Sequence, residues 1–276
     1  MFSERAAGSD LPGRRTRAVR DGDDWIVNGQ KIWTTGAQFC DFGMLLTRTD
    51  PDAPKHAGIT YFIVDMRSPG IEIRPIRQIN GGTGFNEVFF SDVRIPDLNR
   101  VGAVNDGWRG AITTLMNERA AIGGGGAGLG FTELLSTVRS TPYGDGSALD
   151  DPAVRQRLAD FYVRSTGLTY TTYRTLTALS RGQTPGPESS IGKLVGAPLR
   201  QEMAAFALEV LGSAGTITSG DESDGGAWQR AYLTTPGLRL AGGTDEILRN
   251  IIAERVLGLP AEVRVDKNVP FAQIPR

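Results

Sequence analysis

The side chains that most often carry out chemistry are scarce in this sequence. It contains one cysteine, Cys40, and one histidine, His56. A cysteine nucleophile needs a nearby base, and Cys40 follows Phe39, so we predict that Cys40 is a small core residue. His56 follows Lys55 in a proline-rich loop, where we predict a solvated surface position. One residue of each type excludes a disulfide framework and the common cysteine and histidine metal clusters, and we predict no metal site.

Two glycine patterns resemble nucleotide-binding loops. Residues 123–128 contain the G-x-G-x-x-G spacing of a dinucleotide site, but such a site needs a strand before the glycines. Residues 108–122 have a helical pattern instead, so we predict that these glycines allow close packing against a helix. Lys193 follows a glycine as in a P-loop, but Leu194 replaces the required serine or threonine. We therefore predict no phosphate-binding loop at either place.

Composition restricts the possible classes of protein. The chain has 276 residues, a formal net charge of −1 and 39% hydrophobic residues. This apolar content is sufficient for a sizeable core, and the balanced charge gives no basic surface for nucleic acid or anionic lipid. No apolar run is long enough to span a membrane, and no apolar leader follows the first residue. We expect a cytoplasmic protein.

The first third of the chain has the pattern of a β domain. The expected strands are residues 16–20, 25–28, 43–47, 59–65, 71–77 and 86–95. Asp21-Gly22-Asp23 predicts a hairpin between the first two strands, and Asn28-Gly29 predicts a second turn. Short strands at this spacing predict a small antiparallel barrel or sandwich over residues 1–103.

From Trp108 onward the pattern is helical. The expected helices begin at residue 108 and span residues 152–181, 189–211 and 244–258. Asp151 before Pro152 is typical of an N-cap followed by the first helical residue. Four amphipathic helices with modest connections predict a four-helix bundle over residues 104–265, with a tail over 266–276.

Four segments, in this order along the chain, resemble motifs of the acyl-CoA dehydrogenase family. They are residues 2–10 (FSERAAGSD), 27–36 (VNGQKIWTTG), 86–96 (NEVFFSDVRIP) and 242–250 (GGTDEILRN). The resemblance implies a middle β domain followed by a C-terminal four-helix domain. Family members also carry a helical domain before the first motif, so we expect this chain to lack that N-terminal domain. A misassigned start codon, a fragment or a truncated gene would each account for this.

The resemblance also implies a reaction. Family members remove the α-proton of an acyl-CoA thioester while a β-hydride moves to flavin N5, which gives a trans-2-enoyl-CoA. This needs a carboxylate base and hydrogen bonds to the thioester carbonyl. Of the two family positions for the base, one is Gly242 here and has no side chain; the other is Glu118, in a Glu-Arg pair. We expect Glu118 to be the base, with a solvated helix glutamate as the alternative, and the Gly242 N–H to stabilise the enolate oxygen.

The resemblance assigns FAD as the cofactor. Trp33 resembles the tryptophan that shields the flavin ring, with ordinary core packing as the alternative. Thr35 resembles the residue that approaches flavin N5. The expected FAD contacts are Ser3, Ser9, Trp33, Thr34, Thr35, Arg139, Gly212, Ser213, Thr244 and Glu246. The expected substrate contacts are Ser9, Met116 and Arg119.

Three functions remain open at this point. The first is an FAD-dependent acyl-CoA dehydrogenase of fatty acid β-oxidation, a homodimer or homotetramer that passes electrons to an electron-transfer flavoprotein. The second is a non-catalytic or partner subunit of a heteromeric acyl-CoA dehydrogenase, or an inactive truncated fragment. The third is a flavin oxidase or monooxygenase on the same scaffold, which would not need Glu118.

Overall fold

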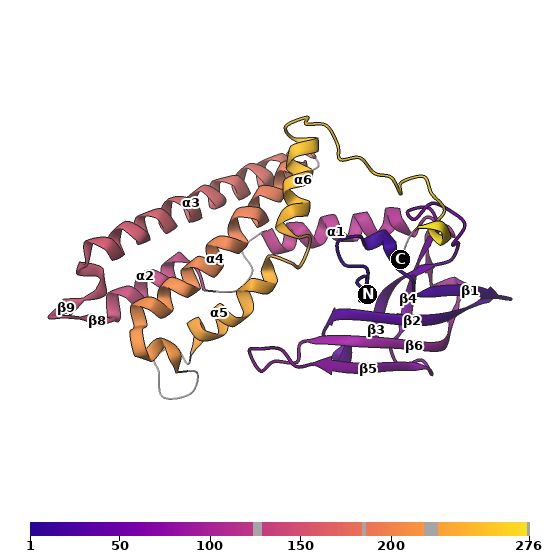
Figure 1. The fold of residues 1–276 in the computed structure, drawn as a ribbon, viewed down its shortest axis with the longest axis horizontal. Coiled ribbons are helices and arrows are strands. Elements are labelled where there is room, and N and C mark those ends of the chain that lie inside the picture. Colours follow the sequence, from indigo (N-terminus) through magenta and orange to yellow (C-terminus); the bar gives the residue numbers. More distant parts are fainter. Residues whose placement is uncertain (124–128, 184–185, 218–225, 275–276) are drawn as a thin grey trace. The chain divides into compact units, whose positions relative to one another are not determined.

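The structure consists of two compact units (Figure 1). It is a computed structural model that describes residues 1–123, 129–183, 186–217 and 226–274, without the side chains of residues 116–123. The β unit comprises Met1–Met116 and Glu262–Arg276, and the helical unit comprises Asn117–Ala261. The described helices include none that is long and apolar enough to cross a membrane.

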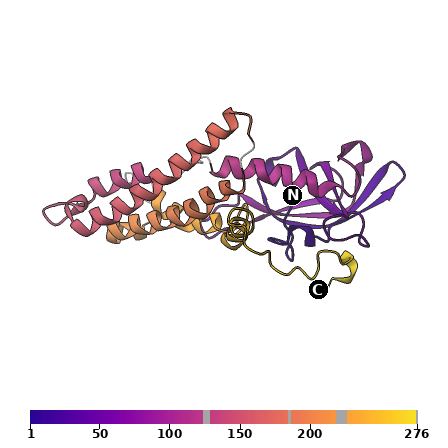
Figure 2. The same cartoon turned by 90° about the horizontal axis from the view of Figure 1, so that it is seen from above.

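The β unit is built on a seven-stranded sheet of order β5-β6-β2-β1-β3-β4-β7. The strands are β1 (Arg17–Asp21), β2 (Asp24–Thr35), β3 (Phe42–Arg48), β4 (Ile59–Asp65), β5 (Ile71–Ile76), β6 (Phe85–Pro96) and β7 (Arg100–Val101). Neighbouring strands are antiparallel, except that β1 lies parallel to β3. The predicted antiparallel β fold is confirmed, with this one parallel junction. Figure 2 shows the strands crossing one another, as they do in a strongly twisted sheet.

The first three residues lie between β2 and β3. The Met1 amino group donates to the Met44 carbonyl, and the Leu46 N–H donates to the Met1 carbonyl at 3.4 Å. The Ile32 N–H donates to the Ser3 carbonyl at 3.0 Å. These bonds pair the N-terminal segment with both strands.

Side chains that alternate along the strands form the core of the β unit. Val27, Leu45, Phe62, Val88 and Val93 are fully buried in it. Such alternation buries one face of each strand.

The predicted turn at Asn28-Gly29 is wrong. Both residues lie inside β2, where the pairing with β6 shifts register between Val27 and Gly29. Gly29 has φ +151°, and a Cβ there would lie 2.7 Å from the Thr16 Cα atom. Glycine is therefore required for a bulge at this position, not for a turn.

Among the described residues that follow, six segments form α-helices. They are α1 (Gly107–Gly123), α2 (Phe131–Ser140), α3 (Pro152–Ser180), α4 (Ser190–Leu211), α5 (Ala227–Leu238) and α6 (Asp245–Arg255). A small hairpin, β8 (Pro142–Tyr143) with β9 (Gly146–Ser147), lies between α2 and α3. Short 3₁₀ helices span Leu11–Gly13, Ala37–Phe39, Asp97–Asn99, Ala148–Asp150, Pro187–Ser189, Gly212–Thr216 and Phe271–Gln273.

The four predicted helices are confirmed, and two others were not predicted. Asp151 caps α3 as expected, because its carboxylate accepts from the Ala153 N–H at 2.7 Å. The unpredicted helices are α2 and α5. The glycine pattern begins at Gly123, the last residue of α1, and its remaining glycines lie outside the described residues.

The core of the helical unit forms around α4. Phe206 of α4 packs against Phe161 of α3 with ring centroids 5.5 Å apart. Leu134 of α2 and Trp228 of α5 are buried in the same cluster. Figure 1 shows α6 next to the first turns of α4, and the beginning of α5 next to the last turns of α4.

Two single-residue predictions have different outcomes. Cys40 is exposed, so its predicted core position is wrong. It directly follows the short 3₁₀ helix at Ala37–Phe39, whose own Phe39 is 84% exposed. His56 was predicted to be solvated, but it is only partly exposed, because its ring packs edge-on against Trp108 at a centroid distance of 5.0 Å. Burial, helped by the Lys55 charge, lowers the pKa of His56.

Candidate functional site

The C-terminal end of β2 presents an aromatic ring to solvent. The pairing of β2 with β6 shifts register between Lys31 and Thr34, and within this irregularity Trp33 has φ +60°. Trp33 is 55% exposed. Its ring lies nearly perpendicular to the ring of Phe85, with the two ring centroids 5.9 Å apart. It is therefore not a core residue. A positive φ at a bulky residue is uncommon and often marks a functional position.

Two threonines follow Trp33 on the same strand. Thr35 is exposed, whereas the Thr34 Oγ1 atom is buried and makes no hydrogen bond within the described part of the chain. The Thr34 carbonyl accepts from the Asn86 side-chain amide at 3.0 Å. This strand end therefore offers a flat aromatic surface and an exposed hydroxyl, and holds a buried hydroxyl that no described residue satisfies.

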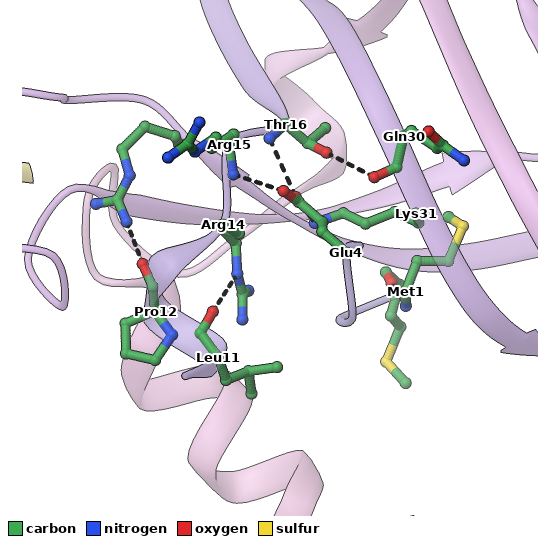
Figure 3. A network of polar contacts seen from close by, with 11 residues as sticks. Met1, Glu4, Leu11, Pro12, Arg14, Arg15, Thr16, Gln30 and Lys31 are labelled. Carbon is green, nitrogen blue, oxygen red and sulfur yellow. Dashed lines mark hydrogen bonds and ion pairs between the residues drawn. The ribbon is translucent and has the colours of Figure 1, made fainter. Parts of the chain in front are cut away.

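The loop that contains Ser3 and Ser9 is held by a buried ion pair (Figure 3). The Glu4 carboxylate accepts from Lys31 Nζ at 2.7 Å, from the Arg15 N–H at 2.6 Å and from the Thr16 N–H at 3.0 Å. The Lys31 side chain is fully buried and that of Glu4 is 9% exposed. Ser3 is half-buried and Ser9 is exposed.

Positive charge is concentrated around Glu4. Arg14 is fully buried; its Nε donates to the Leu11 carbonyl at 2.8 Å, and neither Nη atom has a partner among the described residues. Arg48 is also buried and donates to the Lys55 carbonyl at 2.9 Å. Burial lowers the pKa of Lys31 to about 7 and that of Arg14 to about 9. Burial alone would raise the pKa of Glu4, but the charge and hydrogen bond of Lys31 lower it.

Sequence reasoning missed the role of this network. Residues 2–10 and 27–36 were recognised as separate motifs, and the ion pair joins a residue of each. The sequence did contain a signal for this ion pair, since one motif has an acidic residue and the other has a lysine. The network fixes the Ser3–Ser9 loop beside β2.

The helical unit contains a second group of expected site residues. Gly242 and Gly243 have φ values of +64° and +102° and form a turn directly before α6. Thr244 caps α6, since its Oγ1 accepts from the Ile247 N–H at 3.3 Å. Glu246 is exposed in the first turn of α6, where its own backbone N–H lowers the pKa of its carboxyl. The N–H groups at a helix N-terminus favour negative charge.

Two basic residues hold this turn from other helices. Lys193, in the first turn of α4 and 9% exposed, donates from Nζ to the Gly243 carbonyl. Arg239, which follows α5, bonds the buried Asp245 carboxylate with Nε at 2.7 Å and an Nη atom at 2.6 Å. Neither contact was predicted. A lysine in a largely apolar helix was the available signal, because a buried ammonium needs a partner.

The remaining expected residues lie elsewhere. Arg139 is exposed in the last turn of α2, and Gly212 and Ser213 are exposed where α4 ends. Figure 1 shows the end of α2 and the end of α4 away from α6, so these three residues are not in the Gly242–Glu246 group. Positions 116, 118 and 119 lie in α1, but the side chains of Met116, Glu118 and Arg119 lie outside the described residues. Among the residues whose side chains are described, no histidine, cysteine or acidic group could hold a metal ion.

Comparison with known proteins identifies the family. The acyl-CoA dehydrogenase middle domain matches residues 1–93, and the acyl-CoA dehydrogenase C-terminal domain matches residues 105–257. The chain belongs to the acyl-CoA dehydrogenase family. The resemblance seen in the four motifs is thus confirmed, and members of this family are typically flavoproteins.

Two relatives in Mycobacterium tuberculosis show the extent of the similarity. Acyl-CoA dehydrogenase FadE34 is 45% identical over 261 residues, which are 94% of this chain and 35% of that protein. Acyl-CoA dehydrogenase IpdE1 is 40% identical over 272 residues, which are 95% of this chain and 67% of that protein. The chain thus spans about a third of one relative and two thirds of the other.

Solved structures of acyl-CoA dehydrogenases have the same fold. The Tcur3481-Tcur3483 steroid ACAD matches with a TM-score of 0.83 and 30% identity, over 95% of this chain and 67% of the matched chain. The ChsE4-ChsE5 complex from Mycobacterium tuberculosis matches with a TM-score of 0.81 and 32% identity, over 95% of this chain and 68% of the matched chain. The predicted fold class is confirmed.

Proposed function

We propose that this chain takes part in the FAD-dependent α,β-dehydrogenation of an acyl-CoA thioester to a trans-2-enoyl-CoA, with electrons passed to an electron-transfer flavoprotein. The observation that carries the proposal is the presentation of Trp33 at the end of β2. A tryptophan that is 55% exposed and held at positive φ is costly unless a flat partner covers it. Membership in the acyl-CoA dehydrogenase family supports a flavin as that partner. The expected cellular site is the cytoplasm.

The residues at the end of β2 fit an FAD isoalloxazine ring. Trp33 would pack against one face of the ring, and Thr35 would donate from its hydroxyl to the ring edge. Thr34 brings a buried hydroxyl that no described residue satisfies. The Ser3–Ser9 loop, fixed by the Glu4–Lys31 pair, would contact the flavin and, through Ser9, the CoA arm. When bound, FAD supplies the acceptor for the hydride.

The residues around the thioester have separate tasks in this proposal. Glu118, in α1, is the base that takes the α-proton, and Met116 and Arg119 of the same helix contact the substrate. Gly242 donates its backbone N–H to the thioester oxygen as negative charge develops there. Because this donor belongs to the main chain, the absence of a side chain at Gly242 does not remove it.

The two groups of flavin residues in the helical unit are far apart. Lys193 of α4 contacts the turn before Thr244. Gly212, the residue that follows α4, is 19 positions further along the chain. At about 1.5 Å per residue this stretch is roughly 28 Å long. We therefore assign Thr244 and Glu246 to one FAD, and Gly212, Ser213 and Arg139 to the adenine end of a second FAD that another subunit holds.

A heteromeric enzyme is the second candidate. It is favoured by the similarity to the Tcur3481-Tcur3483 steroid ACAD and to the ChsE4-ChsE5 complex, each of which is named for two different chains. In this version the chain pairs with a related subunit, acts on a steroid acyl-CoA thioester and contributes part of a shared site. Co-expression with related chains followed by co-purification and FAD measurement distinguishes the two candidates.

Anaerobic mixing of the FAD-loaded protein with acyl-CoA thioesters tests the proposal. We expect the oxidised-flavin absorbance to disappear and a 2-enoyl-CoA to form in equal amount. Straight-chain, branched and steroid thioesters are compared, each with and without a co-purified partner chain. Flavin that stays oxidised with every thioester, alone and in complex, would contradict the proposed function.

A further inference from the structure

The lysine in the first turn of α4 is an unusual residue to bury. Lys193 is 9% exposed and lies on a helix whose other buried residues are mainly apolar, such as Leu199, Met203 and Phe206. Removing an ammonium from water is costly unless it is hydrogen-bonded. Here Nζ donates to the Gly243 carbonyl, 50 positions along the chain. This bond joins the first turn of α4 to the residues directly before α6.

The partner of Lys193 is a turn that would otherwise be free to change its backbone conformation. Gly242 and Gly243 both have positive φ, and glycine has more accessible backbone conformations than any other residue. The direction of the Gly242 N–H therefore depends on what holds the turn from outside. In the helical unit, Lys193 bonds the second of the two glycines directly.

The chain on either side of the two glycines is also fixed. Before the turn, the Ala241 N–H donates to the Gly237 carbonyl at 3.0 Å. After it, Arg239 bonds the buried Asp245 carboxylate. With both flanks held, the ammonium on the Gly243 carbonyl leaves little freedom for the torsions of Gly242.

We propose that Lys193 is a positioning residue, whose ammonium holds the Gly242–Gly243 turn so that the Gly242 N–H is aimed at the thioester carbonyl oxygen. The inference rests on the proposed function, in which that N–H stabilises the developing enolate. A donor must be placed within a fraction of an ångström to act on a transition state, and small displacements are expensive. Lys193 does not contact the substrate.

Hydrogen exchange measures the anchoring without reference to activity. We expect Lys193→Met to accelerate amide exchange in a peptide covering residues 239–246 by about 5- to 10-fold, because a bond from a charged donor is lost. Lys193→Arg keeps a charged donor and should show a smaller increase. Lys267→Met, at an exposed lysine in the other unit, is the charge-matched control and should leave this peptide unchanged.

The same variants, loaded with FAD, test the catalytic consequence. An aromatic 2-enoyl-CoA absorbs at longer wavelength when its thioester carbonyl accepts hydrogen bonds, so we expect a smaller red shift on Lys193→Met than on the parent. We also expect kcat to fall by about 10- to 100-fold with a smaller change in KM and an unchanged FAD content. Lys193→Arg should recover part of both signals.

The outcomes separate the two hypotheses. Parent-like exchange and a parent-like red shift in Lys193→Met would overturn the positioning role. Faster exchange in a protein whose parent form reduces no flavin with any thioester would support the anchoring and contradict the proposed function. If Lys193→Met does not fold, Lys193→Gln, which is shorter and uncharged, takes its place, and exchange in Lys193→Gln identical to that of the parent would contradict the inference.

Discussion

Individual buried charges determine how the N-terminal loop is held. The Glu4 carboxylate lies among Lys31, Arg14 and Arg48, and it bonds Lys31 directly at 2.7 Å. Removing one partner of a buried pair is more damaging than removing both, because a charge is left without compensation. The conformation of the loop that carries Ser3 and Ser9 therefore depends on one acidic residue.

The first prediction concerns the loss of the negative charge of Glu4. Glu4→Gln keeps the shape of the side chain but leaves the buried Lys31 ammonium without its acidic partner, so we expect it to lower the free energy of unfolding by roughly 3 kcal/mol. Urea denaturation measures the change. Glu72→Gln is the control, because Glu72 pairs with Arg74 on the exposed surface and its loss should leave the unfolding midpoint unchanged. Equal midpoints for both variants would contradict the structural role of Glu4.

A second prediction concerns the pH dependence of stability. Burial lowers the pKa of Lys31 to about 7, whereas the ordinary value in an unfolded chain is 10.5. Between these values the unfolded chain binds more protons, so the contribution of Lys31 makes the free energy of unfolding rise with pH. We expect urea unfolding at pH 7 and pH 8.5 to show this rise in the parent and in Lys267→Met. Lys31→Met should lack it, and an identical rise in Lys31→Met would rule the assignment out.

The third prediction concerns the base. Glu118→Gln keeps shape and hydrogen bonding but cannot accept the α-proton, so reduction of bound flavin by an acyl-CoA should slow by at least roughly 10²-fold with unchanged FAD content. Anaerobic stopped-flow absorbance measures the rate. Reduction at the parent rate would mean that the base comes from a partner chain, and the heteromeric candidate would then be preferred.

At the scale of elements, periodicity and capping residues predicted most of the fold. The strand at Ile59–Asp65 and the long helix α3 after its Asp151 cap were found because their patterns are long and clearly bounded. The helices α2 and α5 were missed: α2 has ten residues, and α5 contains Pro236, which normally argues against a helix.

The candidate site was predictable only in part. The resemblance indicated Trp33 and Gly242, because each lies within a short motif. The contacts that hold these motifs join residues far apart in the chain: 27 positions separate Glu4 from Lys31, and 50 separate Lys193 from Gly243. Sequence spacing carries no information on such pairs, since tertiary packing creates them.

The fourth prediction concerns the longest helix. Gly167 lies inside α3 with an ordinary helical backbone, and a Cβ there would meet no atom within 4 Å. Gly167→Ala should therefore stabilise the protein by about 0.5–1 kcal/mol, since alanine loses less backbone entropy in a helix. Thermal unfolding should show a Tm about 2 °C higher. The control is Gly182→Ala, at a glycine that lies just after the end of α3. Gly182 has φ +72°, a backbone conformation that is unfavourable for alanine, so this substitution should lower Tm.

At the scale of the whole molecule, α3 is incompletely covered within one chain. It has 29 residues, of which Leu158 and Phe161 are buried. Tyr162, Tyr170, Tyr173 and Leu176 are 54–63% exposed, and their spacing places them within about 120° of arc on the helix. Large exposed apolar patches are rare on monomers.

The last prediction is that a second copy or a related subunit covers this face of α3. We expect light scattering to report a dimer or a dimer of dimers, a multiple of the 29.6 kDa chain mass or, with a partner chain, the corresponding heteromer. In a symmetric dimer each substitution occurs twice at the interface, so Tyr173→Glu should produce monomers, whereas Ala153→Glu, on the opposite side of the same helix and also exposed, should not. Because we assign Gly212 and Ser213 to an FAD that another subunit holds, dissociation should also release FAD. A parent protein that is monomeric at micromolar concentration and retains stoichiometric FAD would contradict both the interface and the shared cofactor.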